Sequence, residues 1–392
     1  MLRSLKGLYH LLVAIIANIW FRFPSRDLTV IGVTGTDGKT TTTTLIYEIL
    51  RQAGVKVSAI TSVHAAIAGR EYDTGFHVTT PSAWWVQKYL REAVDHGDTH
   101  MVLEVTSHAL SQFRVFGVQF EIGVITNVTH EHLDWHSTFE NYLRTKLTLL
   151  RQAKIAVVNR DEADLYVASL PYLSYKRYFT YGIRRDSMVN PLTSPLRLKL
   201  LGEFNRYNAL AALAASQALG IDKRQAIKTL HNFSGIVGRM EVIQTKPFTV
   251  IVDFAHTPNA LMKALAAART MTKKRLIHVF GSAGLRDRTK RPLMGEASAA
   301  YADSIILTEE DYRTEDVNRI IDAIMEGIPH GKDVYREANR KTALIKAIGM
   351  AKPGDVVMVT GKGHEKSLCR GHKEYPWSDQ KEIKKILRKG RV

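Results

Sequence analysis

The stretch Val30-Ile31-Gly32-Val33-Thr34-Gly35-Thr36-Asp37-Gly38-Lys39-Thr40-Thr41-Thr42 predicts a buried strand, a glycine-rich turn and the start of a helix. The apolar, β-branched run 28–33 suits a strand that is covered on both faces. Gly35 and Gly38 permit backbone angles that other residues resist, and they let backbone N–H groups approach a ligand closely. Residues 40–53 suit a helix, and Gly54 is a C-terminal stop signal.

A phosphate group fits at the N-terminus of this predicted helix, because free N–H groups and the helix dipole both favour negative charge there. Lys39 would pair with the outer phosphates, and the Thr40 hydroxyl would reach a magnesium ion. The standard pattern G-x-x-x-x-G-K-[ST] fails, since Val33 stands where its first glycine belongs. The match is to the variant T-G-T-x-G-K-T-T. An ordinary glycine turn is the alternative, but the order of strand, loop, lysine and helix favours a phosphate loop.

The composition is that of a globular chain long enough for two or three domains. It has 392 residues, of which 45% are hydrophobic and 24% are charged. The single cysteine, Cys369, cannot form an internal disulfide, so a cytoplasmic protein is expected. The net charge of +17 permits nucleic acid, anionic lipid or phosphorylated substrates as partners. No zinc-finger spacing or stacking-aromatic motif accompanies the basic residues, so nucleic acid is not expected as a partner.

Residues 8–21 form the most apolar segment of the chain. The segment is short for a membrane span, which needs about 20 residues. Arg3 and Lys6 precede it as in a signal peptide, but no small-residue cleavage site follows. A helix that packs on the domain and a helix that lies at a membrane surface, with Trp20 at the interface, both stay open.

Strands and helices alternate after the phosphate loop, with strands expected at 55–61, 101–104, 122–126 and 155–159 and a helix at 82–93. A second series has strands at 248–253, 276–280, 304–308 and 356–360 and helices at 259–271, 292–301, 317–325 and 340–347. Such alternation predicts parallel sheets with helices on both faces. The expected fold class is α/β: a P-loop-type parallel-sheet ATPase domain, followed by a second, Rossmann-like α/β domain.

The glycines of the segment 235–239 suit a hinge between these domains. We therefore expect an apolar N-terminal segment at 1–26, a central ATP-binding domain at 27–236 and a C-terminal domain at 237–392. Three prolines between 165 and 201 predict irregular structure there. The basic run at 381–391 is expected to be solvated.

Polar residues stand at the carboxyl ends of the predicted strands, where ligands gather in such folds. Glu104 ends its strand and could hold magnesium between two phosphates, although a solvated acid is the alternative. Segment 126–136 contains three histidines and two acids. It lacks the spacing of helical zinc proteases and supporting cysteines, so a magnesium or substrate role fits better than zinc, with a polar surface loop as the alternative. Lys146, taken alone, is a surface residue of a predicted helix.

Three polar loops follow strands of the second series, at 253–261, 281–291 and 361–365. The middle loop is glycine-rich and then strongly basic, which suits carboxylates or phosphates because arginine binds them bidentately. Loops at the carboxyl ends of strands of one sheet imply one shared site.

Together these strings resemble the Mur ligase family of ATP-dependent enzymes that build the peptidoglycan peptide, and within it the UDP-N-acetylmuramoyl-tripeptide synthetases. The resemblance runs from residue 29 to residue 379 and keeps the order and spacing of the family's motifs. The strings that carry it are TGTDGKTTT (34–42), TTP (79–81), EVTSHAL (104–110), TNVTHEHLDWH (126–136), GEFNRYNALAA (202–212), GIVGRME (235–241), DFAHTPNAL (253–261), GLRDRTKRPLMG (284–295), EDYRTED (310–316) and GKGHE (361–365).

The resemblance implies a ligase that adds an amino acid to a muramoyl-dipeptide through an acyl phosphate, in peptidoglycan biosynthesis. The implied cofactors are ATP, two Mg²⁺ ions and CO₂, which carbamylates Lys146. The implied partners are a muramoyl-peptide precursor and a free amino acid. A cytoplasmic monomer is expected, with residues 8–21 as the candidate contact to the cytoplasmic face of the membrane.

The resemblance also implies roles for individual residues. The catalytic residues would be Lys39, Glu104, His132 and Lys146, and the metal-binding residues would be Thr40, Glu104, His132 and Lys146. ATP would be bound by Gly35, Thr36, Asp37, Gly38, Lys39, Thr40, Thr41, Asn205, Asn208, Arg239, Asp253 and His256. The muropeptide would be bound by Thr79, Thr80, Thr106, Gln112 and Arg114. The incoming amino acid would be selected by Arg286, Glu310, Asp311, Tyr312, Arg313, Gly361 and Glu365.

The chain departs from the family's pattern in three places. Family members carry an N-terminal domain of roughly a hundred residues for the uridine nucleotide, whereas the phosphate loop here begins at residue 34. The loop written D-N-P-R in diaminopimelate-adding members is Glu310-Asp311-Tyr312-Arg313, in which Arg313 suits a distal carboxylate but Tyr312 replaces proline. Gln380 replaces the arginine that usually follows the C-terminal F-x-D motif.

These departures leave alternatives to a UDP-linked acceptor. The acceptor could be a non-UDP or lipid-linked muropeptide, or a folylpolyglutamate-type carboxylate. A non-catalytic nucleotide-binding subunit is a rival of another class, against which the intact Lys39, Glu104, His132 and Lys146 argue. Diaminopimelate is favoured as the added amino acid, with lysine and others left open.

Overall fold

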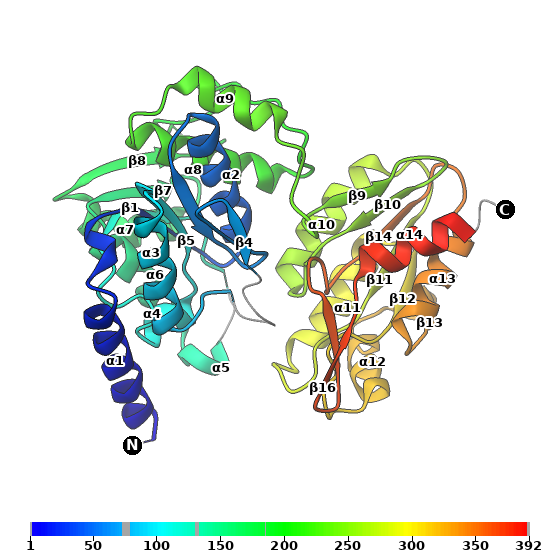
Figure 1. The fold of residues 1–392 in the computed structure, drawn as a ribbon. Coiled ribbons are helices and arrows are strands. Elements are labelled where there is room, and N and C mark those ends of the chain that lie inside the picture. Colours follow the sequence, from blue (N-terminus) through cyan, green and yellow to red (C-terminus); the bar gives the residue numbers. More distant parts are fainter. Residues whose placement is uncertain (1, 73–78, 130–132, 185, 390–392) are drawn as a thin grey trace. The chain divides into compact units, whose positions relative to one another are not determined.

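The computed structural model describes residues 2–72, 79–129, 133–184 and 186–389. The chain divides into two compact units, which are drawn in Figure 1. Unit 1 comprises residues 1–199 and 204–233, and unit 2 comprises residues 200–203 and 234–392. Each unit is built on a sheet that is mostly parallel and carries helices, so the predicted α/β fold class is confirmed. Among the described residues, no helix is both long enough and apolar enough to cross a membrane.

Unit 1 has an eight-stranded sheet in the order β4-β3-β2-β5-β1-β6-β7-β8. Its strands are β1 (Thr29–Thr34), β2 (Val57–Ile60), β3 (Ala65–Ile67), β4 (Arg70–Tyr72), β5 (His100–Glu104), β6 (Phe120–Ile125), β7 (Ile155–Asn159) and β8 (Arg177–Tyr181). Strand β1 runs parallel to β5 and β6, with Val33 opposite Glu104 and Thr34 opposite Ile125. The carboxyl ends of β1, β5 and β6 therefore lie side by side. Strands β3 and β4 continue the sheet in antiparallel pairs.

The helices of unit 1 cover this sheet. They are α1 (Leu2–Trp20), α2 (Lys39–Gln52), α3 (Ala83–Asp95), α4 (Ser107–Ser111), α5 (Leu133–His136), α6 (Phe139–Gln152), α7 (Ala163–Leu173), α8 (Glu203–Ala218) and α9 (Lys223–Asn232), with the short 3-10 helix η1 (Pro24–Arg26) before β1. The predicted strand at 28–33 and helix at 40–53 are confirmed as β1 and α2. Gly54 ends α2 with a left-handed φ of 80°, as the stop signal predicts.

The irregular structure that we expected between residues 165 and 201 is wrong for its first part. Helix α7 continues through Pro171 near its C-terminal end and buries Leu165 and Leu173. Strand β8 pairs in parallel with β7 along its whole length. Pro171 lies in the last turn of α7, where it disrupts few hydrogen bonds of the helix. Burial of the apolar side chains of α7 outweighs the usual helix-breaking effect of proline.

Unit 2 has a six-stranded sheet in the order β13-β12-β11-β14-β10-β9, in which only the β9–β10 pair is antiparallel. Its strands are β9 (Glu241–Gln244), β10 (Thr249–Val252), β11 (Leu276–Phe280), β12 (Ser304–Leu307), β13 (Asp333–Arg336) and β14 (Val356–Val359). Its helices are α10 (Pro258–Met271), α11 (Lys290–Tyr301), α12 (Val317–Met325), α13 (Arg340–Met350) and α14 (Asp379–Lys389). The four strands and four helices of the second predicted series are all present within a few residues of the expected bounds.

Several elements of unit 2 were not expected, among them β9 and β13 at the two ends of its sheet. Strands β15 (Ser367–Arg370) and β16 (Lys373–Pro376) form a separate antiparallel hairpin. The basic run that begins at Lys381 is exposed through its lysines, as expected, but it forms helix α14, which buries Ile383. The apolar positions of α14 were masked in the sequence by the surrounding charges.

Candidate active site

The loop between β1 and α2 can be built only with glycine at two positions. Gly35 has a φ of 150°, and a Cβ atom there would lie 1.8 Å from Oγ1 of Thr126. Gly38 has a φ of 80°, and a Cβ atom there would lie 2.2 Å from Oδ1 of Asn208. The close approach of the backbone to its neighbours explains both glycines of the motif.

The end of strand β6 holds this loop in place. The backbone N–H of Thr36 donates to the carbonyl of Asn127 at 2.8 Å, and the N–H of Asp37 donates to Oδ1 of Asn127 at 3.0 Å. The Thr126 hydroxyl donates to the carbonyl of Asp37 at 2.7 Å. Helix α2 begins directly after the loop, and no side chain caps its N-terminus. The N-terminus of a helix of 14 residues is thus presented as an anion site.

Lys39 and Thr40 stand at the start of α2, and Thr41 is buried beside them. The Nζ atom of Lys39 folds back to donate to the carbonyl of Thr36 at 2.8 Å, so the ammonium group lies over the loop. The Thr40 hydroxyl points the other way and donates to Oε1 of Glu104 at 3.1 Å. The sequence motif therefore places a cation and a hydroxyl–carboxylate pair at one helix end.

Glu104 is buried at the end of β5 and accepts hydrogen bonds from two neighbouring segments. Besides Thr40, its donors are the Ser62 hydroxyl at 3.0 Å and the Ser62 backbone N–H at 2.8 Å. Sequence reasoning missed Ser62. The signal was present, because Ser62 follows the carboxyl end of the parallel strand β2, which is next to β5.

Lys146 is buried, which contradicts its interpretation as a surface residue from spacing alone. Helix α6 packs closely on the sheet, where Leu149 meets the Cα of Gly32, and this packing turns Lys146 inwards. Its Nζ atom donates to the carbonyl of Gly35 at 2.5 Å and lies 4.5 Å from the ring centroid of Tyr142. His132, which was predicted to bind metal, lies outside the described residues.

The oxygen donors of this group fit magnesium. The part of the chain that the structure describes contains no cluster of three or more His, Cys, Asp or Glu residues that could hold a metal. The Thr40 hydroxyl and the Glu104 carboxylate are hard oxygen ligands of the kind that Mg²⁺ prefers. An ammonium group has no lone pair to offer a metal, so Lys146 could join this set only as a carbamate.

Two asparagines of α8 brace the phosphate loop from another side. Asn208 donates through Nδ2 to Oδ1 of Asn205 at 3.0 Å, and its own Oδ1 lies 3.4 Å from the hydroxyl of Thr42. Both asparagines are buried. The structure thus brings Asn208, predicted to bind ATP, against Gly38 of the loop.

Four of the five predicted muropeptide residues form one hydrogen-bond network. The Thr80 hydroxyl donates to the carbonyl of Glu104 at 2.9 Å and lies 3.4 Å from Oγ1 of Thr106, which caps α4. Arg114 donates to the carbonyl of Thr80 at 2.7 Å and grips Oε1 of Gln112 with two N–H groups. Burial lowers the pKa of Arg114 from its usual value. Thr79, the fifth residue, directly precedes Thr80.

The predicted nucleotide residues of unit 2 surround an aromatic ring that sequence reasoning missed. The Arg239 guanidinium lies 4.6 Å from the ring centroid of Phe254, and the His256 and His364 rings lie 4.7 and 4.8 Å from it. Asp253 accepts the backbone N–H groups of Met240 and Ala255 at 2.7 and 2.8 Å. Burial, with the nearby Lys290, lowers the pKa of His256 to about 4, so this ring is neutral at pH 7. A flat, partly cationic platform of this kind suits a base or sugar.

Two of the predicted amino-acid residues, Asp311 and Glu365, contact a buried lysine, Lys362. Its Nζ atom pairs with Asp311 at 2.8 Å and also with Glu365. Arg313 donates to the carbonyl of Gly284 at 2.8 Å. Tyr312 is half-buried and Arg286 is exposed.

Glu310 differs from these paired acids. Its Oε2 atom is buried, has no hydrogen-bond partner among the described residues and lies 2.7 Å from where a Cβ on Gly361 would be. Burial raises the pKa of Glu310 to about 7, against the opposing effect of Lys290 and Lys362. The site therefore holds one carboxyl group that can change its charge near neutral pH.

The protein families and relatives that this sequence matches agree with this geometry. The family profile of the Mur ligase middle domain matches residues 33–216, and that of the Mur ligase glutamate ligase domain matches residues 238–363.

The chain belongs to the Mur ligase family.

Its relatives include a UDP-N-acetylmuramoyl-L-alanyl-D-glutamate–2,6-diaminopimelate ligase of Aquifex aeolicus, which is 39% identical over 95% of this chain and 80% of its own length. A UDP-N-acetylmuramyl-tripeptide synthetase of Roseiflexus is 38% identical over 96% of this chain and 81% of its own length. A solved structure of a UDP-N-acetylmuramoyl-L-alanyl-D-glutamate–2,6-diaminopimelate ligase superposes with a TM-score of 0.64 at 31% identity, over 93% of this chain and 79% of that one. The family consists of ATP- and magnesium-dependent amide ligases of peptidoglycan synthesis, and this chain is such a ligase.

Several residues of this Mur ligase that support the predicted site were not foreseen. Arg370 pairs with Glu309 at 2.6 Å, and Arg291 pairs with Glu315 at 2.9 Å, holding the pKa of Glu315 at about 2. Gln380, noted above as a departure, donates to the carbonyl of Gly363 at 2.9 Å and to Glu241 at 3.0 Å. It thus holds the loop at 361–365 without an arginine.

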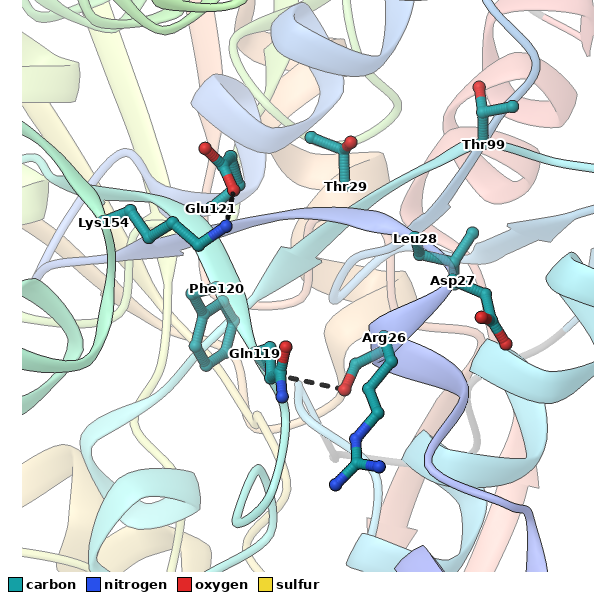
Figure 2. Close-up of a pocket in the computed structure, with 10 residues that line it drawn as sticks. Arg26, Asp27, Leu28, Thr29, Thr99, Gln119, Phe120, Glu121 and Lys154 are labelled. Carbon is teal, nitrogen blue, oxygen red and sulfur yellow. Dashed lines mark hydrogen bonds and ion pairs between the residues drawn. The ribbon is translucent and has the colours of Figure 1, made fainter.

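A cavity of about 400 Å³ lies elsewhere in unit 1 of this Mur ligase (Figure 2). It is lined where β1 and β6 begin, by Thr29 and Phe120 among others, with Lys154 and Glu121 paired at 2.8 Å. None of the predicted site residues that the structure describes lines it. The phosphate loop follows the carboxyl end of β1, whereas this cavity lies at the amino ends of β1 and β6. The cavity and the candidate site are therefore at opposite ends of these strands.

Proposed function

We propose that this ligase joins diaminopimelate to the D-glutamate of UDP-N-acetylmuramoyl-L-alanyl-D-glutamate. The names of relatives that share up to 39% identity over 95% of the chain support this pair of substrates. The retained Arg313 supports an amino acid with a distal carboxylate, because a guanidinium binds carboxylates bidentately. We further propose that the ligase acts as a monomer in the cytoplasm. A contact of residues 8–21 with the membrane would depend on helix α1 rather than on the catalytic residues.

One observation carries the catalytic proposal: the Thr40–Glu104 pair at the N-terminus of α2, beside Lys39. The hydroxyl and carboxylate are 3.1 Å apart, and Lys39 lies over the loop. These groups would bind the triphosphate of ATP with its magnesium, which supplies neutralisation of phosphate charge when bound.

The reaction follows from these positions in two steps. A carboxylate oxygen of the acceptor attacks the γ-phosphorus of ATP, the bond to the β–γ bridging oxygen breaks, and ADP leaves. Lys39 and the N–H groups of α2 stabilise negative charge on the phosphoryl group. The amino nitrogen of the second substrate, having lost a proton, then attacks the acyl carbon. The C–O bond breaks, phosphate leaves, the nitrogen gives up a second proton to the departing phosphate, and an amide forms.

We propose that Lys146 acts as a carbamate. Its amine is buried next to the carbonyl of Gly35, where CO₂ addition would replace a positive charge with a carboxylate beside the phosphate loop. A carboxylate there would offer oxygen ligands that match the Glu104 and Thr40 pair. The unmodified lysine would instead attract phosphate directly.

A phosphate-release assay tests the substrates. The muramoyl-dipeptide, with and without UDP, is crossed against diaminopimelate, lysine and glutamate. The proposal expects turnover at least tenfold faster with the UDP-linked acceptor and diaminopimelate than with any other pair. Faster turnover with the acceptor lacking UDP, or with a folate-type carboxylate, would mean that this compound is the acceptor and that the proposed one is wrong. Faster turnover with lysine would mean that lysine, and not diaminopimelate, is the added amino acid.

Variants test the catalytic roles. Lys39→Ala should lower phosphate release at least 100-fold, since a contact made in the transition state is lost. Lys146→Ala should lose activity to a similar extent and regain part of it with added short carboxylates. Lys154→Ala, which removes an exposed lysine from the same unit, is the matched control and should keep full activity. Unchanged turnover of Lys39→Ala with an unchanged melting curve would remove Lys39 from the catalytic residues. Absence of phosphate release by the folded parent with every substrate pair would indicate a non-catalytic subunit.

A further inference from the structure

Helix α1 buries its small side chains and exposes its large ones. Ala14, Ala17 and Asn18 are buried against unit 1. Leu12 and Ile16, on another side of the helix, are 51% and 56% exposed. A helix that packed as part of an ordinary core would have the reverse arrangement.

The buried side fixes the helix in this orientation. The Nδ2 group of Asn18 donates to the carbonyl of Phe116 at 2.8 Å, and a Cβ on Gly117 would lie 2.4 Å from Oδ1 of Asn18. Space for a leucine is therefore absent where Asn18 meets Gly117. The rings of Trp20 and Phe21 also contact Trp84 of α3, with centroids 5.9 and 5.0 Å apart. In Figure 1, α1 extends away from the sheet of unit 1 towards the N-terminus.

The exposed side is a continuous apolar stripe. At 100° per residue its aliphatic members fall within an arc of about 100°, and Tyr9 and Trp20 lie together along one edge of it. The stripe consists of Leu8, Leu12, Ile15, Ile16 and Ile19, all exposed in the described part of the chain. An apolar stripe bordered by amphipathic aromatic rings is typical of a helix at the boundary between water and lipid.

The charges around α1 indicate which kind of partner would cover the apolar stripe. Residues 1–26 contain Arg3, Lys6, Arg22 and Arg26 and no aspartate or glutamate. This segment is complementary to a negative surface. A second copy of the chain would bring an equally basic segment to the same stripe, and like charges at an interface cost binding free energy.

We propose that α1 docks unit 1 on an anionic lipid surface. The helix lies in the plane of the surface with its apolar stripe below the headgroups, and the exposed side chains of Lys6 and Arg22 pair with lipid phosphates. An in-plane helix agrees with the absence, among described residues, of any helix suited to cross a membrane. The docking surface does not depend on the proposed substrates, because no residue of α1 belongs to the candidate active site.

Co-sedimentation of the full chain with vesicles tests this proposal. One vesicle type is phosphatidylcholine alone, and the other contains phosphatidylglycerol as well. The proposal expects binding to the phosphatidylglycerol vesicles that is at least tenfold stronger and weakens as salt is raised. Lys6→Gln with Arg22→Gln should remove most of this preference.

Paired substitutions locate the contact. Ile16→Glu with Ile19→Glu should weaken binding at least tenfold, since both side chains are exposed and the fold does not need them. Val167→Glu with Leu170→Glu on α7 adds the same charges at exposed apolar positions and should leave binding close to that of the parent. Melting curves and phosphate release in solution should stay unchanged in both pairs.

Three results would overturn the proposal. They are equal sedimentation with both vesicle types, equal loss of binding in the α1 and α7 pairs, and failure of the parent chain to sediment with either vesicle. Concentration-dependent dimerisation that Ile16→Glu with Ile19→Glu abolishes, without lipid binding, would assign the stripe to a second copy.

Discussion

The phosphate loop of unit 1 and the amino-acid loops of unit 2 are built from different interactions. The loop at Gly35–Gly38 is held by hydroxyl, amide and backbone groups, among them those of Thr126 and Asn127. The loops around Asp311 are held by ion pairs, in which Lys362 joins Asp311 to Glu365 and Arg370 grips Glu309. Below them, Arg340 and Asp379 form a pair that is fully buried.

This difference has a physical consequence. Neutral donors around a phosphate site leave its few charges, such as that of Lys39, free to act on an anionic ligand. Ion pairs around a site for a zwitterion cancel one another, so the field depends on which charge is left over. In unit 2 one such group is Glu310, whose carboxyl is buried and has one oxygen without a hydrogen-bond partner among the described residues.

Breaking the buried pair should have the largest effect. Arg340→Met leaves Asp379 as a buried charge without its cation and removes a hydrogen bond to the carbonyl of Thr360. We expect unit 2 to lose about 3–5 kcal/mol of unfolding free energy and its melting temperature to fall by roughly 10 °C, as calorimetry would measure. Arg336→Met, which removes the exposed pair with Asp322, is the control and should cost less than about 1 kcal/mol. Equal effects would mean that the buried pair adds no structural constraint.

The charge state of Glu310 should produce the next largest effect, with a defined pH dependence. Between pH 4.5 and about 7 the unfolded chain ionises this carboxyl while the folded chain keeps it protonated. The contribution of Glu310 is therefore fully present below pH 4.5 and is lost as pH rises through 7. The loss above pH 7 is on the order of 3 kcal/mol.

Glu310→Gln cannot ionise, so the parent should lose stability relative to this variant as the pH is raised from 4 to 8. Denaturant unfolding at several pH values measures the difference. A parent and variant whose stabilities run parallel across this range would show that Glu310 titrates near its ordinary value.

The smallest of the three effects concerns the close contact in the phosphate loop. Gly38→Ala combines a positive φ with a Cβ 2.2 Å from Asn208, and Gly54→Ala has the same φ of 80° with open space around it. Gly54→Ala should cost about 1 kcal/mol. Gly38→Ala should cost about 1 kcal/mol more and weaken ATP binding at least tenfold, because the loop must move. Thermal melting and ATP titration measure both. If the two variants had the same stability and the same affinity for ATP, the close contact between Gly38 and Asn208 would contribute to neither.

The parts of the molecule that the sequence made predictable are those in which neighbours along the chain are also neighbours in space. The strand, turn and helix at the phosphate loop are of this kind. Its glycines and Lys39 could be recognised in the sequence because a phosphate-binding turn requires these residue types at these positions. The carbamate role of Lys146 was implied only by resemblance, and its burial was not predicted, since burial depends on how α6 packs over Gly32.

The supporting ion pairs were beyond sequence reasoning for the opposite reason. Arg340 and Asp379 are 39 positions apart, and Arg370 and Glu309 are 61 apart. No local pattern relates such residues, and each one alone resembles an ordinary surface charge. The hairpin of β15 and β16, which supplies Arg370, was missed because its short polar strands lack a buried alternation.

The two edges of the eight-stranded sheet are poor templates for another strand. In the described part of the chain strand β4 spans three residues, and Arg70 and Glu71 on it are exposed. Strand β8, at the other edge, begins with the exposed Arg177 and Tyr178. Short edges and outward-facing charges hinder the addition of a strand from another molecule. At high protein concentration, therefore, aggregation through sheet extension is disfavoured, and the apolar stripe of α1 is the surface to mutate first when the protein is to be kept dispersed.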